Sequence, residues 1–363
     1  MKRINLLSLF LLLTASVVAQ VNLDYQKPPQ EILDLVDVPR APWVLMNTEG
    51  DTMLLMYRDS YKTIAGLSEE ELRLGGLRIN PKTNIGSRTT FYKNIKIKGI
   101  EAREINGLPE DAQLSNFNWS PDESKMAFTN TIENGVQVWI LDLETATAKR
   151  VTEAFVNANM GNPISWFKDG KSLLVNMLPA TRKELITTAE AVPTGPTIST
   201  SDGSKAQNRT YQDLLQNPND VFNFEQLATS ALVKVNLDGT STLWKDAAMY
   251  SDVSFSPDGT YIMTSTIHKP FSYIVPYYRF PETVTVYDQD GTEVKVVNET
   301  PLLEELPQGF MATQTGKRRI SWRADQPATL YWVEALDQGD PEVQVDYRDQ
   351  VCKKRLLPVL RKK

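Results

Sequence analysis

A pattern of apolar runs separated by polar turns recurs along this chain. The clearest copy is VSFSPDGTYIM at residues 253–263, where Val253 and Phe255 alternate with polar neighbours ahead of the turn SPDG. In such a turn Pro presets φ, Asp bonds its own backbone, and Gly accepts a positive φ. Because the alternation resumes after the turn, this copy predicts a β-hairpin.

Further copies of this turn phrase are FNWSPDESKMAF (117–128), ISWFKDGKSLLV (164–175), ISWRADQPATLYW (320–332) and the degenerate PWVLMNTEGDTMLLM (42–56). Trp119 and Trp166 are 47 residues apart, close to the ~40–45 residues of a four-stranded propeller blade. The 89 residues from Trp166 to Phe255 predict about two blades. The 67 residues from Phe255 to Trp322 predict one blade and an insertion.

A second hairpin pattern, of strand, Asp-containing turn and strand, follows several copies at 136–152, 231–244 and 284–297. Since the order of the two patterns itself recurs, we expect an all-β fold. The expected architecture is a β-propeller of four-stranded antiparallel blades, incomplete at about five blades, with short helices in insertions. An ordinary β-sandwich with similar turns is the alternative.

The segments between these hairpins predict short helices and links. The apolar positions of 32–36 predict a helical turn that Pro39 ends, and Ser68 with Glu71 predicts a capping box ahead of a short helix. Residues 75–92 read as a polar link, and 181–226 as an insertion with a short helix at 210–216.

Residues 1–19 are expected to be a signal peptide outside the fold. Lys2 and Arg3 precede the apolar run 6–18, and a cut is expected between Ala19 and Gln20. A membrane anchor is the alternative, but that run is shorter than the ~20 residues of a spanning helix. We therefore expect a periplasmic or secreted protein with a propeller domain at 20–351 and a basic tail at 352–363.

Composition excludes some partners. The net charge is −6, with basic residues concentrated in the last dozen positions, so we expect no nucleic-acid partner. The single cysteine, Cys352, has no intramolecular partner for a disulfide. We expect no membrane association after signal cleavage.

Candidate chemistry is sparse. His268 is the one histidine, and the sequence has no G-x-S-x-G motif, so a Ser-His-Asp triad has no recognisable context and we assign no catalytic residue. The His and Cys counts exclude a metal site built on those ligands, the acidic turns lack calcium-loop spacing, and no phosphate-cradling Gly loop occurs. We expect no metal and no cofactor.

A binding surface is the remaining possibility. Residues 267–281 carry five aromatic side chains among three prolines, which indicates either core and rim packing or a wall that a peptide contacts. Arginines in the same segment and in the links could pair with a ligand carboxylate. The candidate substrate contacts are Arg78, Arg88, Arg209, Tyr277 and Arg279.

Five longer phrases carry a family resemblance: PPQEILDLVDVPRAP, LGGLRINPKTNIGSRTTFY, NRTYQDLLQNPND, PFSYIVPYYRFP and RRISWRADQPATLYWVEALDQGD. Together they resemble the prolyl oligopeptidase family of serine peptidases, and within it the glutamyl endopeptidase-like subgroup. The resemblance covers about 28–346. It implies an N-terminal propeller that restricts access to an α/β-hydrolase domain carrying serine, aspartate and histidine, with cleavage after glutamate.

The sequence departs from that family pattern because it contains no hydrolase motif. We expect the propeller portion of an exported peptidase, inactive alone, whose catalytic domain is separately encoded or lost, and whose complete form acts on peptides. The alternative is a stand-alone periplasmic propeller that binds a peptide or protein.

Overall fold

The computed structural model describes residues 26–98, 102–187 and 210–356, and the chain divides into two units, Met1–Arg40 and Ala41–Lys363. In the first unit, residues Gln30–Val36 form α2 with Glu31 in the first turn. This confirms the short helix expected at 32–36. Its apolar side chains are not buried, since Leu35 is 78% exposed.

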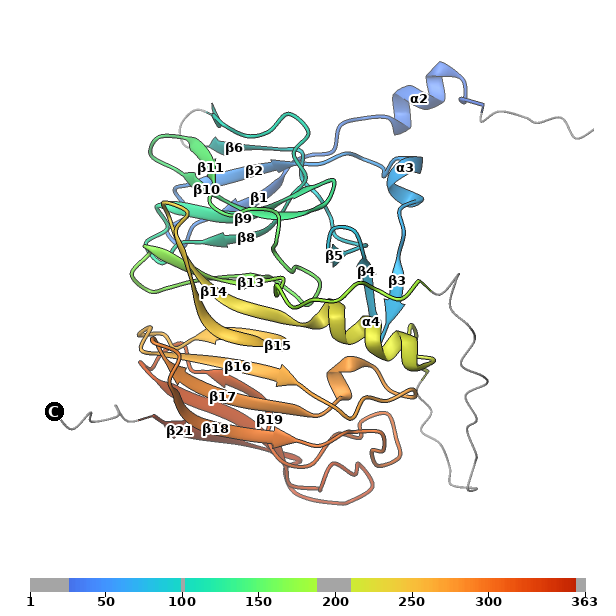
Figure 1. The fold of residues 1–363 in the computed structure, drawn as a ribbon, viewed down its shortest axis with the longest axis vertical. Helices are drawn as coiled ribbons and strands as arrows, with labels where there is room; N and C mark the ends of the chain where they lie inside the picture. Colours follow the sequence, from blue (N-terminus) through green and yellow to red (C-terminus); the bar gives the residue numbers. More distant parts are fainter. Residues whose placement is uncertain (1–25, 99–101, 188–209, 357–363) are drawn as a thin grey trace, which may run out of the picture. The chain divides into compact units, whose positions relative to one another are not determined.

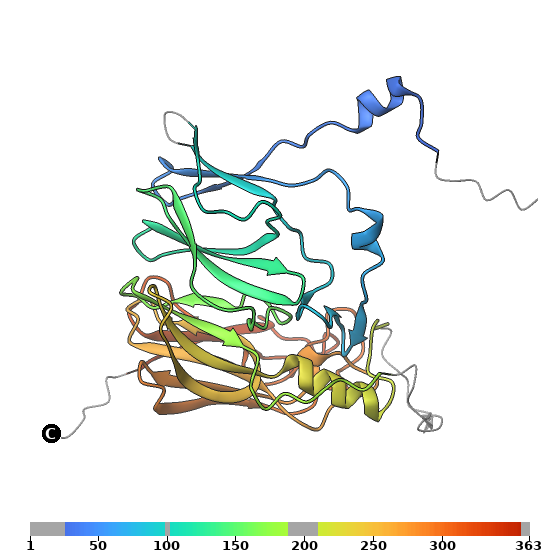
Figure 2. The same ribbon diagram turned by 45° about the horizontal axis from the view of Figure 1, so that its top comes forward.

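In the second unit the strands form antiparallel sheets that follow chain order (Figure 1, and from a second direction Figure 2). The first sheet contains β1 (Trp43–Met46), β2 (Met53–Tyr57), β6 (Asn94–Lys98) and β7 (Ala102–Glu104). The second contains β8 (Leu114–Trp119), β9 (Lys125–Ile132), β10 (Gly135–Asp142) and β11 (Thr147–Arg150). We call them blade 1 and blade 2.

A seven-stranded sheet supplies two further blades through one long strand, β15 (Ser241–Phe255). Its first half pairs with β14 and its second half, from Met249, pairs with β16. Blade 3 is therefore β12 (Ile164–Trp166), β13 (Ser172–Met177), β14 (Ser230–Asn236) and the first half of β15. Blade 4 is the second half of β15 with β16 (Tyr261–Ile267), β17 (Glu282–Asp288) and β18 (Glu293–Thr300).

Blade 5 has three strands, β19 (Arg318–Trp322), β20 (Thr329–Ala335) and β21 (Asp349–Arg355). The turn phrases at 42–56, 117–128, 164–175, 253–263 and 320–332 form the first hairpin of blades 1 to 5. The described part of the chain thus confirms the expected antiparallel blades of a propeller. It contains about five blades, and each has four strands except blade 5, which has three.

One prediction from the repeat spacing is wrong. The 89 residues between Trp166 and Phe255 predict a separation of about two blades, but the two residues lie in consecutive blades, 3 and 4. The extra length is an insertion between β13 and β14 that includes α4 (Pro218–Ala228). Blade spacing fails as a guide here because a strand connection accepts a long insertion at little cost in closure entropy.

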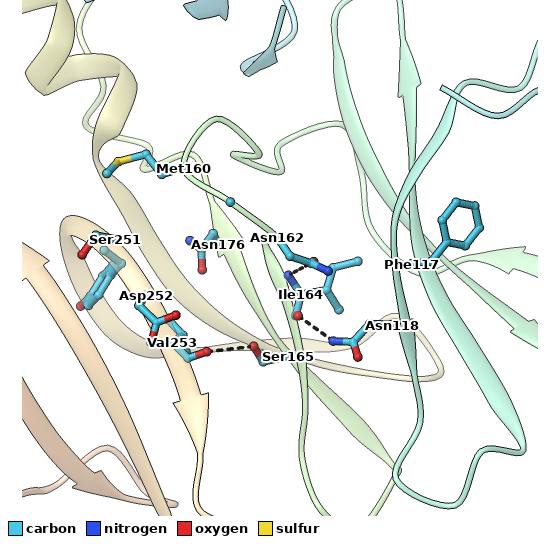
Figure 3. A pocket seen from close by; sticks show the side chains of 12 residues that line it. Phe117, Asn118, Met160, Asn162, Ile164, Ser165, Asn176, Ser251, Asp252 and Val253 are labelled. Atoms are coloured by element: carbon cyan, nitrogen blue, oxygen red, sulfur yellow. Dashed lines mark hydrogen bonds between the residues drawn. The ribbon is translucent and has the colours of Figure 1, made fainter. Parts of the chain in front are cut away.

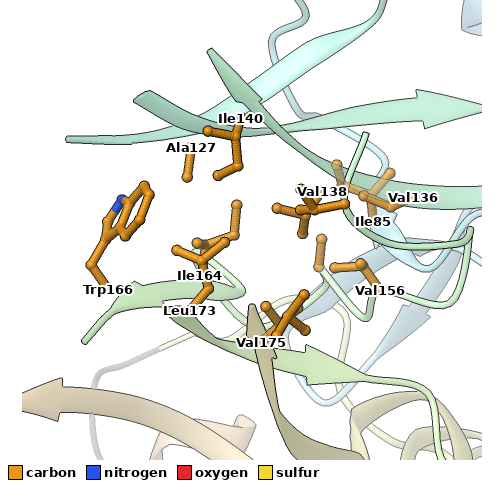
Figure 4. Close-up of a cluster of buried hydrophobic side chains, with 13 residues drawn as sticks. Ile85, Ala127, Val136, Val138, Ile140, Val156, Ile164, Trp166, Leu173 and Val175 are labelled. Atoms are coloured by element: carbon orange, nitrogen blue, oxygen red, sulfur yellow. The ribbon is translucent and has the colours of Figure 1, made fainter. Parts of the chain in front are cut away.

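The core lies between successive blades rather than on one face of a sheet. Figure 4 shows Val136, Val138 and Ile140 of blade 2 facing Ile164 and Val175 of blade 3. The intervening residues of the same strands point the other way, and Leu141 joins a second cluster with residues of blade 1. The middle strands of blades 2, 3 and 4 thus bury side chains on both faces, whereas β2 and β6 of blade 1 bury only alternate positions.

The same division recurs further along the chain. Ile262 packs between blades 3 and 4, while its neighbours Tyr261 and Met263 pack between blades 4 and 5. Because side chains alternate with period two, a one-residue slip would exchange the two cores. The register of the middle strands in blades 2, 3 and 4 is therefore fixed from both sides.

The predicted capping box at Ser68 is wrong. The helix there is α3 (Ile64–Leu67), which begins after Thr63, whose hydroxyl accepts a hydrogen bond from the Gly66 amide. Ser68 ends that helix, and Glu71 is followed by β3 (Leu72–Leu74).

The link predicted at 75–92 also contains strands. β3, β4 (Leu77–Asn80) and β5 (Ile85–Gly86) form a small sheet inserted between β2 and β6. We call it the β3–β5 insertion.

Two further boundaries differ from expectation. The helix predicted at 210–216 begins instead at Pro218, because the Asn217 side chain accepts hydrogen bonds from the amides of Asn219 and Asp220. The basic tail predicted from Cys352 begins inside β21, whose residues to Arg355 pair with β20. The expected signal peptide and residues 357–363 lie outside the described residues.

We expect Gly259→Ala to destabilise the fold more than Gly170→Ala. Both glycines occupy the turn of a blade's first hairpin at positive φ, +75° and +66°, so both variants lose roughly 1–2 kcal/mol from the left-handed backbone. A Cβ on Gly259 would also lie 2.4 Å from Lys168 Cβ, whereas one on Gly170 meets nothing nearer than 4.0 Å. Equal midpoints for the two variants in urea unfolding would contradict the close approach of these turns.

Candidate functional site

The predicted arginines of the β3–β5 insertion lie around two carboxylates. Arg78 Nε is 2.5 Å from Asp213 Oδ2, and Arg78 Nη1 is 3.6 Å from Glu71 Oε1. Arg88 Nε is 4.0 Å from Glu71, but its side chain is 70% exposed. Arg78 is thus engaged in holding the segment around Asp213, while the Arg88 guanidinium remains open to solvent.

Glu71 is the centre of this ion-pair group. Its carboxylate accepts hydrogen bonds from Ser87 Oγ at 2.5 Å and Arg73 Nε at 2.9 Å. The Ser87 hydroxyl and then the arginines hold the pKa of Glu71 below its usual range. The Glu71 carboxylate is therefore ionised at neutral pH, and it stabilises the turn between β5 and β6.

Tyr277 and Arg279 lie in η2 (Tyr277–Arg279), against the same insertion. The Tyr277 amide donates to Gly75 O at 2.7 Å, and burial raises the pKa of its phenol. Arg279 is buried, with Nη1 3.4 Å from Leu303 O and its guanidinium 5.3 Å from the centre of the Tyr211 ring.

The structure therefore brings four of the five predicted contacts to one region. The stretch that carries Tyr211 and Asp213 lies between Arg279 and Arg78. The fifth, Arg209, lies outside the described residues. Substrate contact by this group remains a prediction, and most of its interactions are structural.

A pocket of about 300 Å³ lies elsewhere, where the first strands of blades 2, 3 and 4 meet (Figure 3). We call it the Asp252 pocket. It is lined by Phe117, Asn118, Met160, Gly161, Asn162, Ile164, Ser165, Asn176, Tyr250, Ser251, Asp252 and Val253.

Hydrogen bonds within and between blades shape this pocket. Asn118 Nδ2 donates to Ile164 O at 3.0 Å, and Asn162 Oδ1 accepts from the Ile164 amide at 3.1 Å. Ser165 Oγ lies 3.5 Å from Val253 O. These bonds fix the wall, and within the described residues the Asn118 and Asn162 amides each use one of their two polar atoms.

Two carboxylates give the pocket region its charge. Desolvation by the surrounding protein raises the pKa of Asp252, although its side chain reaches solvent. Burial, and then the Asp252 charge, raise the pKa of Glu282, which lies 3.1 Å from Ser251 Oγ. The surroundings of both groups therefore disfavour uncompensated negative charge.

Sequence reasoning missed Asp252, although a signal exists. The turn phrases of blades 2, 4 and 5 can be aligned on the aromatic residue that precedes each turn. In that alignment Asp252 of blade 4 is equivalent to Asn116 of blade 2 and Arg319 of blade 5. The last two have φ of 52° and 53°, and the first strands of blades 2, 4 and 5 all carry register shifts here. Bulges re-aim side chains and often accompany functional sites.

Among the described residues, neither hydrogen-bond partner of the His268 ring is a carboxylate. Its ring nitrogens lie 3.2 Å from Lys269 O and 3.1 Å from Thr283 Oγ1, on an exposed side chain just after β16. The part of the chain that the structure describes holds no group of three or more His, Cys, Asp or Glu placed for a metal ion. Among these same residues, none of the helices has the length and apolar character that crossing a bilayer requires.

No family model matches the chain. A curated rice protein named "Probable glutamyl endopeptidase, chloroplastic" is 34% identical over 352 residues, which cover 92% of this chain and 37% of the relative. The Arabidopsis thaliana protein of the same name is 35% identical over 351 residues, covering 92% and 36%. The chain thus spans little more than a third of the length of these relatives.

Among solved structures, the Pyrococcus horikoshii acylaminoacyl peptidase aligns with 88% of this chain and 38% of its own, at 14% identity and a TM-score of 0.43.

We expect Arg78→Ala to lower the free energy of unfolding by about 2 kcal/mol, because it leaves Asp213 largely buried without its closest cation. The two side chains are 16% and 11% exposed. Arg88→Ala is the matched control and should change stability by less than about 0.5 kcal/mol. Similar losses for the two variants in urea unfolding would contradict this assignment.

Proposed function

We propose that this chain, which belongs to the glutamyl endopeptidase-like subgroup of the prolyl oligopeptidase family, supplies the substrate-restricting propeller portion of a peptidase. The observation that carries the proposal is the sequence identity of 34–35% across 92% of the chain to two proteins named glutamyl endopeptidase. The antiparallel blades support it, because their rigid first strands present polar groups to a shared pocket.

The chemistry of such a peptidase would be acyl transfer. It needs a nucleophile, a histidine base oriented by a carboxylate, and donors for the oxyanion. His268 has a carbonyl and a threonine hydroxyl at its two ring nitrogens instead. We propose that the reacting groups correspond to the part of the curated relatives that this chain does not span, and that this portion controls which peptides reach them.

Peptide hydrolysis tests this function. The purified 363-residue chain should not cleave fluorogenic peptides that contain glutamate. A chimera in which it replaces the matching 352 residues of the rice relative should cleave short peptides but spare a folded protein that contains the same bond. His268→Ala in the chimera should leave the rate unchanged. Cleavage by the chain alone that His268→Ala and a serine-directed inhibitor abolish would contradict the proposal.

A binding role without catalysis is the second candidate, and the Asp252 pocket favours it. The two candidates differ in the chimera, because a binding module of unrelated purpose would not restore size-selective cleavage to the rice protein.

We also propose that the protein is exported to the periplasm or secreted, which the charged and apolar pattern of residues 1–19 supports. N-terminal sequencing of the protein from its native cells should give a chain that starts at Gln20. A chain that retains Lys2 and Arg3 in the cytoplasmic fraction would contradict export.

A further inference from the structure

We propose that the Asp252 pocket binds a protonated amine of a peptide, with Asp252 pairing with the cation and Asn176 hydrogen-bonding the adjacent peptide group. The inference rests on the proposed peptide-handling function and adds a ligand class and a subsite to it. The amine has two sources, the α-ammonium group of a peptide N-terminus and a lysine side chain, and the experiment below separates them.

The side-chain amide of Asn176 indicates that the pocket binds a ligand. Asn176 is 9% exposed, and within the described residues its side-chain amide has no hydrogen-bond partner, while its backbone amide and carbonyl are both bonded. Figure 3 places it among the side chains that surround the pocket. Its side-chain nitrogen and oxygen are not fully enclosed, so water reaches them in the free protein and a bound peptide group would replace that water. A peptide group supplies both the acceptor and the donor that this amide lacks.

Asp252 selects the charge of that ligand. It is the one charged side chain among the twelve residues that line the pocket. Its neighbour Ser251 contacts the second carboxylate, Glu282 Oε2, at 3.1 Å. An amine entering here would relieve the cost that the protein imposes on the Asp252 charge, whereas a carboxylate would add to it.

The remaining lining suits a short stretch of peptide. Asn118 Nδ2 and Asn162 Oδ1 are bonded to the Ile164 backbone. Among the described residues the other polar atom of each amide has no partner, so it can bond a peptide N–H or C=O. Met160 adds an apolar and adaptable contact for the methylene groups beside an amine. A volume of about 300 Å³ is at the small end of ligand sites and matches one or two residues.

Binding of labelled peptides to the 363-residue chain, followed by fluorescence anisotropy, tests this proposal. Three peptides of one length are compared: a free N-terminus without lysine, an acetylated N-terminus with one internal lysine, and an acetylated peptide without lysine. At least one of the first two should bind about tenfold or more tightly than the third. The tighter of the two identifies the source of the amine.

Variants locate the site. Asp252→Asn should weaken the amine peptide about tenfold or more, and Asn176→Ala should weaken it several-fold. Glu299→Gln removes the same charge from an exposed position of blade 4 and should change affinity less than twofold. Asp252 is exposed, so a thermal melt should show Asp252→Asn folded, with a midpoint close to that of wild type.

Two results overturn the proposal: equal binding of all three peptides, including no binding by any, or unchanged affinity in Asp252→Asn. Neither bears on hydrolysis by the chimera, so this inference can fail while the proposed function stands.

Discussion

Burial of both faces of the middle strands in blades 2, 3 and 4 is the constraint on which the rest of this structure depends. Val136 and Val138 pack towards blade 3, while Leu141 on the same strand packs towards blade 1. A blade therefore cannot change its register without breaking two cores at once. This rigidity holds the first strands of blades 2, 3 and 4 close enough for Asn118 to bond Ile164 and for Ser165 to approach Val253, which forms the wall of the Asp252 pocket.

The first hairpins could be predicted from sequence because their determinants are local. The turn before Tyr261 has the residues that its geometry requires, and alternation supplies the strands. The residue spacing before Phe255 predicted one blade too many, because a count of residues between repeats does not distinguish an extra blade from an insertion within one blade. The capping box at Ser68 failed for another reason: Thr63 caps a helix one turn earlier, and Leu72 pairs with Ile79 in a sheet that no local pattern indicates.

The site could be predicted only in part. Residue type marked Arg78 and Arg279 as candidates, but their partners Asp213 and Leu303 are distant in sequence, so their structural engagement was not visible. Asp252 was missed because a lone acidic residue in a strand has no motif. It stands out only when the turn phrases are aligned on their aromatic residue, which places Asn116, Asp252 and Arg319 at equivalent positions of different blades.

Methyl NOEs on the intact chain report directly on this two-sided packing. We expect separate networks for nearby positions of one strand: Val136 and Val138 with Ile164 and Val175, and Leu141 with Leu54 and Ile95. A single network joining Val138 and Leu141 to the same partners would mean that the sheet buries one face only. That result would contradict the stacking of blades and remove the basis for the pocket between their first strands.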